Sequence, residues 1–340
     1  MINLNFSNIG IDEALSILSS HNEKWIQEYH DFLFNYSKQE KFNVKTSGTT
    51  GKRKTIIVSK LQMKQSATST LNYFNLREGN STLLTLSCDF IAGKMMLVRA
   101  IEGKLNLFLA KPTSDPSNYF SREYDFVPLV PMQVESIIKS KKLNQIRNLL
   151  IGGGKLSKDI IQSIQQFNIK AYESFATTET LTHFALKRIC PDFNEWFKTI
   201  NGFEIDKNEK GELVIKKNFI TNCELITNDL IEKKSDSEFK WLGRSDNVIN
   251  SGGIKLIPEE IENKISELIP SEFVLIGMPD EKLGERIALV SKKPLRITLD
   301  EINAVLSRYE KIRVSYVVKR FPLTSSGKIK RKELQKMLNA

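Results

Sequence analysis

Residues 46–54 read Thr46-Ser47-Gly48-Thr49-Thr50-Gly51-Lys52-Arg53-Lys54, and this stretch is the most informative part of the chain. Hydroxyl side chains, glycines and cations are concentrated within it. Glycines let the backbone approach a ligand closely and turn its N–H groups inward. Ser and Thr hydroxyls donate to phosphate oxygens, and lysines add positive charge. The composition of the stretch therefore indicates a loop that cradles a triphosphate.

The spacing of this loop differs from that of a Walker A motif. That motif requires four residues between its first glycine and Gly-Lys-Ser/Thr, whereas two residues separate Gly48 from Gly51. A hairpin turn between residues 43–45 and 55–58 is an alternative interpretation of the same stretch. The loop alone does not decide between the two interpretations.

Downstream of the loop, short apolar runs alternate with helical patterns. The runs that predict strands are 55–58, 82–86, 105–109, 125–130, 148–151 and 169–172. The periodic segments that predict helices are 61–74, 93–101, 134–140 and 158–167. Residues 1–40 are polar, with aromatic residues at helix-like spacing. Because alternating strands and helices build parallel crossovers, the pattern predicts an α/β fold with mainly parallel sheets.

The character of the sequence changes after residue 245. Pro258 begins a predicted helix with an acidic first turn, and the capping box Thr298-x-x-Glu301 begins another. Further strands are expected at 273–277, 286–290 and 314–318. We therefore predict two domains, a large α/β amino-terminal domain over 1–245 and a small α+β carboxy-terminal domain over 246–340.

Positive charge is concentrated at the end of the chain. Lys and Arg number 50 against 40 Asp and Glu, which gives a formal net charge of +10, and much of the excess lies in residues 311–340. A basic end of this kind could bind nucleic acid, a membrane surface or polyanionic small molecules. Residues 311–340 lack the aromatic interleaving of single-strand binders, so we expect no nucleic-acid partner.

Other features of the composition bound the cellular setting. No apolar run approaches the roughly 18 residues that a membrane helix needs, and the first residues lack the basic and apolar regions of a secretory signal. The cysteines Cys88, Cys190 and Cys223 are too far apart for a disulfide framework or a zinc site. We therefore expect no membrane span and a reducing, cytoplasmic location.

Five further segments follow the loop in order. They are Ile151-Gly152-Gly153-Gly154-Lys155, residues 171–179 (AYESFATTE), Thr227-Asn228-Asp229, residues 243–262 (GRSDNVINSGGIKLIPEEIE) and residues 322–331 (PLTSSGKIKR). With the loop, they resemble the signature motifs of the acyl-adenylate-forming (AMP-binding) superfamily, which includes acyl-CoA synthetases, luciferases and peptide-synthetase adenylation domains. The resemblance implies an enzyme that uses ATP, Mg²⁺ and CoA.

The resemblance assigns roles in nucleotide binding residue by residue. It places Asp229 at the ribose and Arg244 at the ribose or a phosphate. Beside the adenine it places Gly153 and either Tyr172 or Phe175, and around the phosphates it places Thr46, Ser47, Gly48, Thr49, Thr50, Gly51 and Lys54. It also implies that Thr178 contacts the α-phosphate and that Glu179 is the Mg²⁺ ligand. A carboxylate suits that role because Mg²⁺ prefers oxygen ligands.

The same resemblance implies a two-step ligase with a mobile carboxy-terminal lid. In the first step, Lys328 bridges the substrate carboxylate and the α-phosphate, and an acyl-adenylate forms. The lid then rotates about the hinge residue Asp246. The loop of Ser251, Gly252 and Gly253 enters the site, and CoA displaces AMP.

The chain is short for this superfamily, and its amino-terminal part is the shortened one. In its size and in the sequences of residues 90–96, 178–183 and 247–255, the chain resembles compact bacterial o-succinylbenzoate–CoA ligases of menaquinone biosynthesis. Such a substrate has two carboxylates, and a buried unpaired charge is costly. Lys94, Arg99 and His183 are the candidates for binding the second carboxylate, and arginine would form the better fork.

Other interpretations remain open at this level. The chain could be an aryl- or fatty-acyl-CoA ligase of other specificity. It could also be a nucleotide-binding module without turnover, which Arg53, Ala176 and the shortened amino terminus favour and the intact Glu179 and Lys328 oppose. A nucleic-acid-binding role is suggested by charge alone. The sequence does not fix the oligomeric state, and a homo-oligomer is compatible with it.

Overall fold

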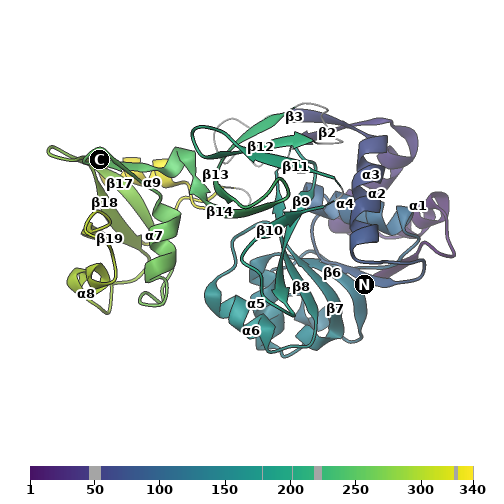
Figure 1. The fold of residues 1–340 in the computed structure, drawn as a ribbon. Helices are drawn as coiled ribbons and strands as arrows, with labels where there is room; N and C mark the ends of the chain where they lie inside the picture. The colour runs from purple at the N-terminus through teal and green to yellow at the C-terminus, as the bar shows by residue number, and fades with distance from the viewer. Residues whose placement is uncertain (46–54, 178, 201, 218–223, 325–327, 340) are drawn as a thin grey trace. The chain divides into compact units, whose positions relative to one another are not determined.

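The computed structural model describes residues 1–340 except 46–54, 178, 201, 218–223, 325–327 and 340. The chain divides into two compact units (Figure 1). Unit 1 contains the described residues between 1 and 204 together with 216, 217 and 224. Unit 2 contains residues 205–215 and the described residues from 225 onward. The predicted domain boundary between 245 and 246 stays a prediction.

Unit 1 is built on a sheet whose centre is parallel. Its strand order is β1-β5-β4-β6-β7-β8-β9-β10, and the neighbours from β5 to β8 run parallel, whereas β1, β9 and β10 are antiparallel to their neighbours. The strands are β1 (Ile2–Asn5), β4 (Ser81–Leu84), β5 (Asn106–Leu109), β6 (Tyr124–Leu129), β7 (Ile146–Ile151), β8 (Lys170–Ala176), β9 (His183–Cys190) and β10 (Phe197–Thr199). The mainly parallel α/β sheet predicted from the sequence is confirmed.

Helices cover both faces of this sheet. They are α1 (Ile11–Ser19), α2 (Lys24–Lys38), α3 (Lys60–Tyr73), α4 (Ile91–Glu102), α5 (Pro131–Lys139) and α6 (Lys158–Gln165), with short 3-10 turns at Ser117–Tyr119 and Leu143–Gln145. Because successive strand residues point to opposite faces, Leu107 and Leu109 join the core under α1–α4, whereas Phe108 joins the core under α5 and α6. Burial on both faces explains why the strands are continuous apolar runs.

The glycine-rich loop joins two strands that pair with each other. Strand β2 (Lys41–Lys45) runs antiparallel to β3 (Thr55–Ser59), and Lys45 is opposite Thr55. The hairpin expected as an alternative is therefore present in the flanking strands. Residues 46–54 themselves lie outside the described residues.

Unit 2 contains two sheets joined by a short 3-10 turn at Ser245–Asn247. The first has the strand order β14-β13-β12-β11, from β11 (Glu204–Lys207), β12 (Glu212–Lys217), β13 (Leu225–Lys233) and β14 (Glu238–Arg244). The second has the order β16-β15-β18-β17, with β19 paired to β18. Its strands are β15 (Ile249–Ser251), β16 (Ile254–Leu256), β17 (Phe273–Asp280), β18 (Gly284–Ser291) and β19 (Ile312–Val317).

The second sheet carries the helices α7 (Pro258–Ile265), α8 (Leu299–Ala304) and α9 (Arg331–Asn339). Helix α8 begins with the predicted capping box, since the Thr298 hydroxyl accepts from the Glu301 N–H and the Glu301 carboxylate accepts from the Thr298 N–H. Pro258 is the first residue of α7, also as predicted. The carboxy-terminal region is therefore α+β.

Gly243 of β14 lies against the start of α7. A β-carbon added there would lie 2.4 Å from Ile257 Cγ2 and 2.5 Å from Glu259 Oε2. Real β-carbons do not approach other atoms so closely, so only glycine fits. The close approach brings β14 against the start of α7, and the predicted hinge residue Asp246 lies in the turn between them.

Candidate active site

Part of the predicted phosphate site cannot be placed. Thr46, Ser47, Gly48, Thr49, Thr50, Gly51 and Lys54 lie outside the described residues, and so does Thr178. Their assignments stay predictions. The remaining candidates fall into separate groups in the two units.

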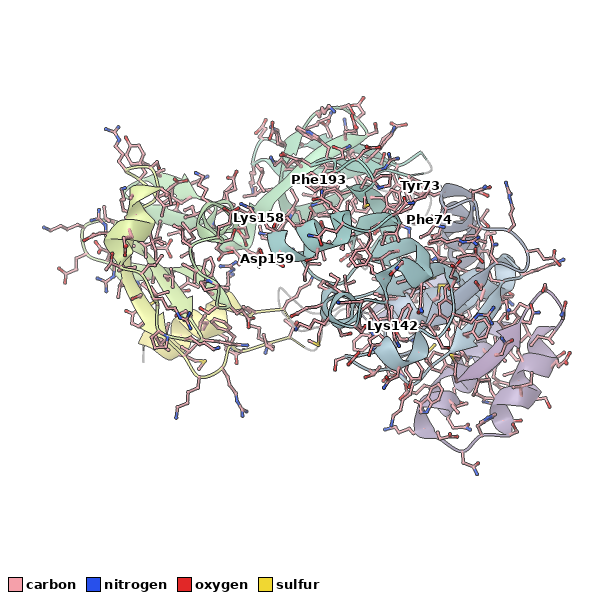
Figure 2. All side chains as sticks on the ribbon, turned by 90° about the horizontal axis from the view of Figure 1, so that it is seen from below. Tyr73, Phe74, Lys142, Lys158, Asp159 and Phe193 are labelled. Atoms are coloured by element: carbon pink, nitrogen blue, oxygen red, sulfur yellow. The ribbon has the colours of Figure 1, made fainter. Side chains whose placement is uncertain are left out.

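Strand β8 of unit 1 carries both aromatic candidates for the adenine. The Tyr172 ring is buried and packs edge-on against Tyr73 and Phe74, with ring centroids 5.5 and 5.4 Å away. Figure 2 labels Tyr73 and Phe74, which are neighbours at the end of α3. Phe175, three residues further along β8, is only half-buried and packs edge-on against Phe184 and Phe197. Phe175 therefore has the more accessible ring of the two.

Glu179 lies in a turn directly after β8. The turn is fixed by reciprocal bonds, because the Thr177 N–H donates to the Thr180 hydroxyl and the Thr180 N–H donates to the Thr177 hydroxyl, each at 3.1 Å. Glu179 is half-buried at this turn. A carboxylate on a fixed turn at the end of a strand suits the predicted role of metal ligand.

The three glycines after β7 allow a tight turn beside β8. Gly153 has a φ of 84°, which favours glycine. A β-carbon on Gly152 would lie 2.8 Å from the Ser174 hydroxyl oxygen, which itself donates to the Ile151 carbonyl. Backbone at Gly153 is thus held next to the strand that carries Phe175.

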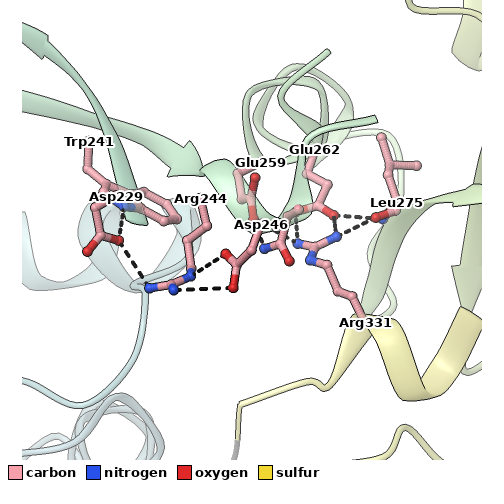
Figure 3. A network of polar contacts seen from close by, with 9 residues as sticks. Asp229, Trp241, Arg244, Asp246, Glu259, Glu262, Leu275 and Arg331 are labelled. Carbon is pink, nitrogen blue, oxygen red and sulfur yellow. Dashed lines mark hydrogen bonds and ion pairs between the residues drawn. The ribbon is translucent and has the colours of Figure 1, made fainter. Parts of the chain in front are cut away.

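Asp229 of β13 and Arg244 of β14 face each other in unit 2. They are directly opposite in the strand register, and Arg244 Nη1 lies 3.6 Å from Asp229 Oδ1 (Figure 3). The Trp241 indole N–H donates to the same Asp229 oxygen at 3.0 Å. Burial raises the pKa of the Asp229 carboxyl, whereas Arg244, the Trp241 hydrogen bond and Lys328 oppose that rise. An ionised carboxylate held in this way is a good acceptor for a ribose diol.

Arg244 also pairs with the predicted hinge residue. Its Nε donates to Asp246 Oδ1 at 2.8 Å, and its Nη2 donates to Asp246 Oδ2 at 3.3 Å. The guanidinium therefore contacts both the candidate ribose carboxylate and the hinge carboxylate. Two-point pairing fixes the direction of an arginine side chain better than a single contact does.

Lys328 belongs to the electrostatic surroundings of this pair. Desolvation of its ammonium lowers the pKa of Lys328, while Asp229 opposes that shift and Arg244 reinforces it. The Lys328 backbone N–H donates to the Thr324 hydroxyl at 3.0 Å, and Leu323 pairs with Ile329 in an isolated antiparallel bridge. Unit 2 thus brings Lys328 near Asp229 and Arg244, although Lys328 follows Asp229 by roughly 100 residues in the sequence.

A clamp around Arg331 anchors the segment that follows Lys328. Arg331 Nη1 and Nη2 donate to the two oxygens of Glu262 at 2.6 and 2.9 Å, and Nη1 also donates to the Leu275 carbonyl (Figure 3). Glu259, a buried residue of α7, lies 3.6 Å from Arg331 Nη2 and accepts from the Asn247 side chain. Sequence analysis did not identify Trp241 or this clamp, although Arg331 ends the last motif.

The loop of Ser251, Gly252 and Gly253 joins β15 to β16. Gly252 and Gly253 have φ values of 58° and 81°, which explains why glycines occupy both positions. Ser251 is opposite Ile254 in the β15–β16 hairpin. The loop is therefore a tight hairpin end.

Two of the three candidate substrate residues lie together in the core of unit 1. Arg99 of α4 is buried, and its Nη2 donates to the Thr182 hydroxyl at 2.8 Å. The same hydroxyl lies 3.2 Å from His183 Nδ1, and His183 Nε2 lies 3.3 Å from the Thr70 hydroxyl. Lys94, in contrast, lies over the Phe32 ring at 6.0 Å.

The charge on Arg99 has no counter-charge within the part of the chain that the structure describes. No carboxylate there pairs with it, and its buried Nε has no hydrogen-bond partner. Burial lowers the pKa of Arg99 to about 10. Burial and the nearby guanidinium also lower the pKa of His183 well below its usual value, so the imidazole is neutral at pH 7. The cluster therefore holds a buried cation that is not paired with a carboxylate among the described residues.

The described residues contain neither a cluster of metal ligands nor a membrane-spanning helix. Among the described residues, no three His, Cys, Asp or Glu side chains form a group that could hold a metal ion. Within the same residues, none of the helices combines the length and apolar character needed to cross a membrane.

The chain is similar to AMP-binding enzymes. A family model described as AMP-binding enzyme matches residues 45–223, more than half of the chain. The 2-succinylbenzoate–CoA ligase of Listeria monocytogenes is 25% identical over 319 residues, which cover 85% of this chain and 68% of that protein. The corresponding ligase of Lactococcus lactis is 23% identical over 317 residues, covering 85% and 69%.

Two solved structures are similar to this chain in fold. An acyl-CoA synthetase (AMP-forming)/AMP-acid ligase II-like protein from Dyadobacter fermentans is 30% identical, with a TM-score of 0.64 and coverage of 95% of this chain and 98% of that one. O-succinylbenzoate coenzyme A synthetase from Bacillus subtilis, in complex with ATP and magnesium ion, is 21% identical, with a TM-score of 0.74 and coverage of 98% and 83%. The second likeness shows the fold alone.

Because the buried His183 is neutral, the free energy of unfolding should depend on pH. Its pKa is lowered on folding, so below pH 6.5 the unfolded chain takes up a proton that the folded chain resists. We expect the free energy of unfolding to fall with decreasing pH by up to about 1.4 kcal/mol per pH unit from this residue. Urea titrations at pH 7.5, 6.5 and 5.5 measure the slope. His183→Gln should flatten it and His30→Gln should not; an unchanged slope in His183→Gln contradicts the assignment.

Proposed function

The chain belongs to the AMP-binding enzyme family, as the sequence motifs predicted, and we propose that its acid substrate is 2-succinylbenzoate. The enzyme is an AMP-forming acid–CoA ligase, which first makes an acyl-adenylate from ATP and then transfers the acyl group to CoA. The relatives named 2-succinylbenzoate–CoA ligase support this substrate, and so does the chemistry of unit 1. The product would serve menaquinone biosynthesis.

The burial of Arg99 is the observation that best supports the proposed substrate. An uncompensated guanidinium in a protein core is costly, and a bound carboxylate removes much of that cost. A dicarboxylic acid has one carboxylate to activate and a second one to be bound. Thr182, the partner of Arg99, stands three residues after Glu179, so one turn would connect the second-carboxylate site to the metal-binding carboxylate. A monocarboxylic aryl or fatty acid offers Arg99 no such partner.

In the first half-reaction, an oxygen of the substrate carboxylate attacks the α-phosphorus of ATP, and pyrophosphate leaves. Asp229, held by Trp241, would accept hydrogen bonds from the ribose hydroxyls. Lys328 would place its ammonium beside the carboxylate and α-phosphate, where negative charge is concentrated. No protein nucleophile is required, since positioning and electrostatics can supply the rate enhancement.

Mg²⁺ fits the donor set at the end of β8. Glu179 offers a carboxylate on a fixed turn, and nucleotide-bound Mg²⁺ often takes only one or two protein carboxylates. When bound, the ion supplies positive charge to the phosphate oxygens. Of the two aromatic candidates for the adenine, the half-buried Phe175 is better exposed for stacking than Tyr172.

In the second half-reaction, the CoA sulfur attacks the acyl carbonyl, the thiol proton is lost and AMP leaves. We propose that residues 246–340 rotate about Asp246 between the steps, so that Lys328 withdraws and the Ser251–Gly253 loop enters. The Arg244–Asp246 ion pair lies where the backbone would turn. We further infer a cytoplasmic location and no nucleic-acid partner, and the oligomeric state is left open.

A substrate panel tests the proposed function. Purified protein is incubated with ATP, Mg²⁺ and CoA and with 2-succinylbenzoate, benzoate, a medium-chain fatty acid or no acid. Pyrophosphate and AMP are quantified, and the thioester is identified by mass. We expect 2-succinylbenzoate to give the highest kcat/KM. A higher value with another acid would assign that specificity instead, and no pyrophosphate with any acid would indicate a nucleotide-binding module.

Arg99→Gln should lower kcat/KM for 2-succinylbenzoate roughly 100-fold, since a buried charge-assisted fork is lost. Two monocarboxylate analogues, each lacking one carboxylate, serve as comparison substrates. The analogue that keeps only the reacting carboxylate should be affected less than about threefold. Lys94→Gln on the same helix is the matched control and should resemble the wild type. Loss of 2-succinylbenzoate activity in Lys94→Gln but not in Arg99→Gln would reassign the second carboxylate to Lys94.

Lys328→Ala should reduce acyl-adenylate formation about 100-fold or more, because its ammonium acts where negative charge develops. The variant should still convert chemically supplied acyl-adenylate and CoA to thioester at close to the wild-type rate. Lys330→Ala, two residues away and ion-paired with Glu333, is the control and should retain both steps. Equal loss of both half-reactions in Lys328→Ala is incompatible with the proposed role.

A further inference from the structure

We propose that Glu285 is a positioning residue for thioester formation, which holds the Ser251–Gly253 loop in the shape that the second half-reaction needs. The proposal deepens the proposed function and rests on it. Glu285 lies at the start of β18, outside the five motif segments and the glycine-rich loop. Its carboxylate accepts a hydrogen bond from the Asn250 N–H, directly before the Ser251–Gly253 loop.

The loop is attached to the rest of its sheet by few backbone bonds. In the described part of unit 2, β15 and β18 are joined through one residue pair, Ser251 opposite Gly284. On one side of that pair, Glu285 Oε2 accepts from the Asn250 N–H at 2.7 Å. A carboxylate acceptor makes a stronger hydrogen bond than a neutral carbonyl does. The Glu285 side chain therefore supplies a hydrogen bond between β15 and β18 in place of a further backbone hydrogen bond.

The other side of the pair is held by the turn between β17 and β18. The Gly252 N–H donates to the Leu283 carbonyl at 2.8 Å. That turn is itself fixed, because Asp280 Oδ1 accepts from the N–H groups of Lys282 and Leu283, each at 3.0 Å. The β17–β18 hairpin therefore accepts hydrogen bonds from the backbone on both sides of Ser251, from Asn250 and from Gly252.

Gly277 of β17 provides the space that the Glu285 side chain occupies. A β-carbon on Gly277 would lie 2.7 Å from Glu285 Oε1 and 3.0 Å from its Cδ. Gly277 is opposite Ile287, so Glu285 is its diagonal neighbour across the two strands. Glycine at this position leaves room for the carboxylate to lie flat over the strand and reach Asn250.

The contacts predict an effect on one half-reaction only. In the proposed mechanism, Lys328, Asp229 and Arg244 serve adenylation, whereas the Ser251–Gly253 loop enters the site for thioester formation. A displacement of about 1 Å in a positioning loop can lower a rate roughly 100-fold. Loss of the hydrogen bond between the Asn250 N–H and Glu285 should therefore slow thioester formation and leave the adenylation residues in place.

The test measures the two half-reactions separately in the full-length chain. Adenylation is followed as pyrophosphate release without CoA, and thioester formation is followed from supplied acyl-adenylate and CoA. We expect Glu285→Ala to slow thioester formation at least roughly tenfold and to change adenylation less than about twofold. Glu285→Gln, whose amide oxygen can still accept from Asn250, should restore most of the rate. Glu281→Ala removes an exposed carboxylate from the adjacent turn and should match the wild type.

A second variant tests the same contact without altering Glu285. Gly277→Ala should push the carboxylate aside, because the flexible end of a side chain yields more readily than a strand. It should reproduce the selective loss, and Glu285→Ala with Gly277→Ala should be no slower than Glu285→Ala alone, as expected for coupled sites. If Glu285→Ala is poorly folded, Gly277→Ala and Glu285→Gln decide the outcome.

Failure of this inference and failure of the proposed function give different results. If the wild-type chain forms no thioester from 2-succinylbenzoate, the proposed substrate fails before any variant is compared. If the wild type is active and the Glu285→Ala and Gly277→Ala variants slow both half-reactions equally, or neither, Glu285 has no role in positioning the loop.

Discussion

A buried negative charge at Asp229 is the constraint on which the nucleotide side of the site depends. Burial raises the pKa of this carboxyl above its ordinary value of 3.8, so at neutral pH its ionised form destabilises the fold. The chain limits that cost with the Trp241 hydrogen bond and with Arg244. Arg244 in turn binds Asp246, so the position of the hinge turn is tied to the charge on Asp229.

Each unit contains some of the residues to which the proposed function assigns a role. Unit 1 contributes the doubly covered sheet, the turn with Glu179 and the buried Arg99. Unit 2 contributes Asp229, Arg244, Lys328 and the Ser251–Gly253 loop. The Arg331 clamp links α9, α7 and β17 within unit 2, so the segment of Lys328 is anchored to the same sheet that carries the loop. Any movement of that sheet would therefore carry both elements together.

Local patterns were sufficient to predict much of this structure. The apolar runs in β4–β8 predicted the parallel sheet, and the Thr298 capping box marked the start of α8. Strand β1 was not predicted, because four residues give little periodicity and its partner β5 is 100 residues away. Trp241 was missed for a similar reason: its contact with Asp229 arises only from the pairing of β13 with β14, which includes an irregularity after Leu230. Arg99 did leave a signal, since a cation at a buried helical position contradicts the apolar pattern around it.

The proposed role of Arg99 has a consequence for small molecules that would compete with the acid substrate. With a pKa of about 10, it keeps its positive charge throughout the physiological range. An inhibitor whose second acidic group is replaced by an ester or amide would leave that cation uncompensated, whereas a tetrazole or sulfonate would preserve the anion. Under the proposed role of Arg99, such an inhibitor has to keep a formal negative charge in place of the second carboxylate. That charge lowers its passive permeability through membranes.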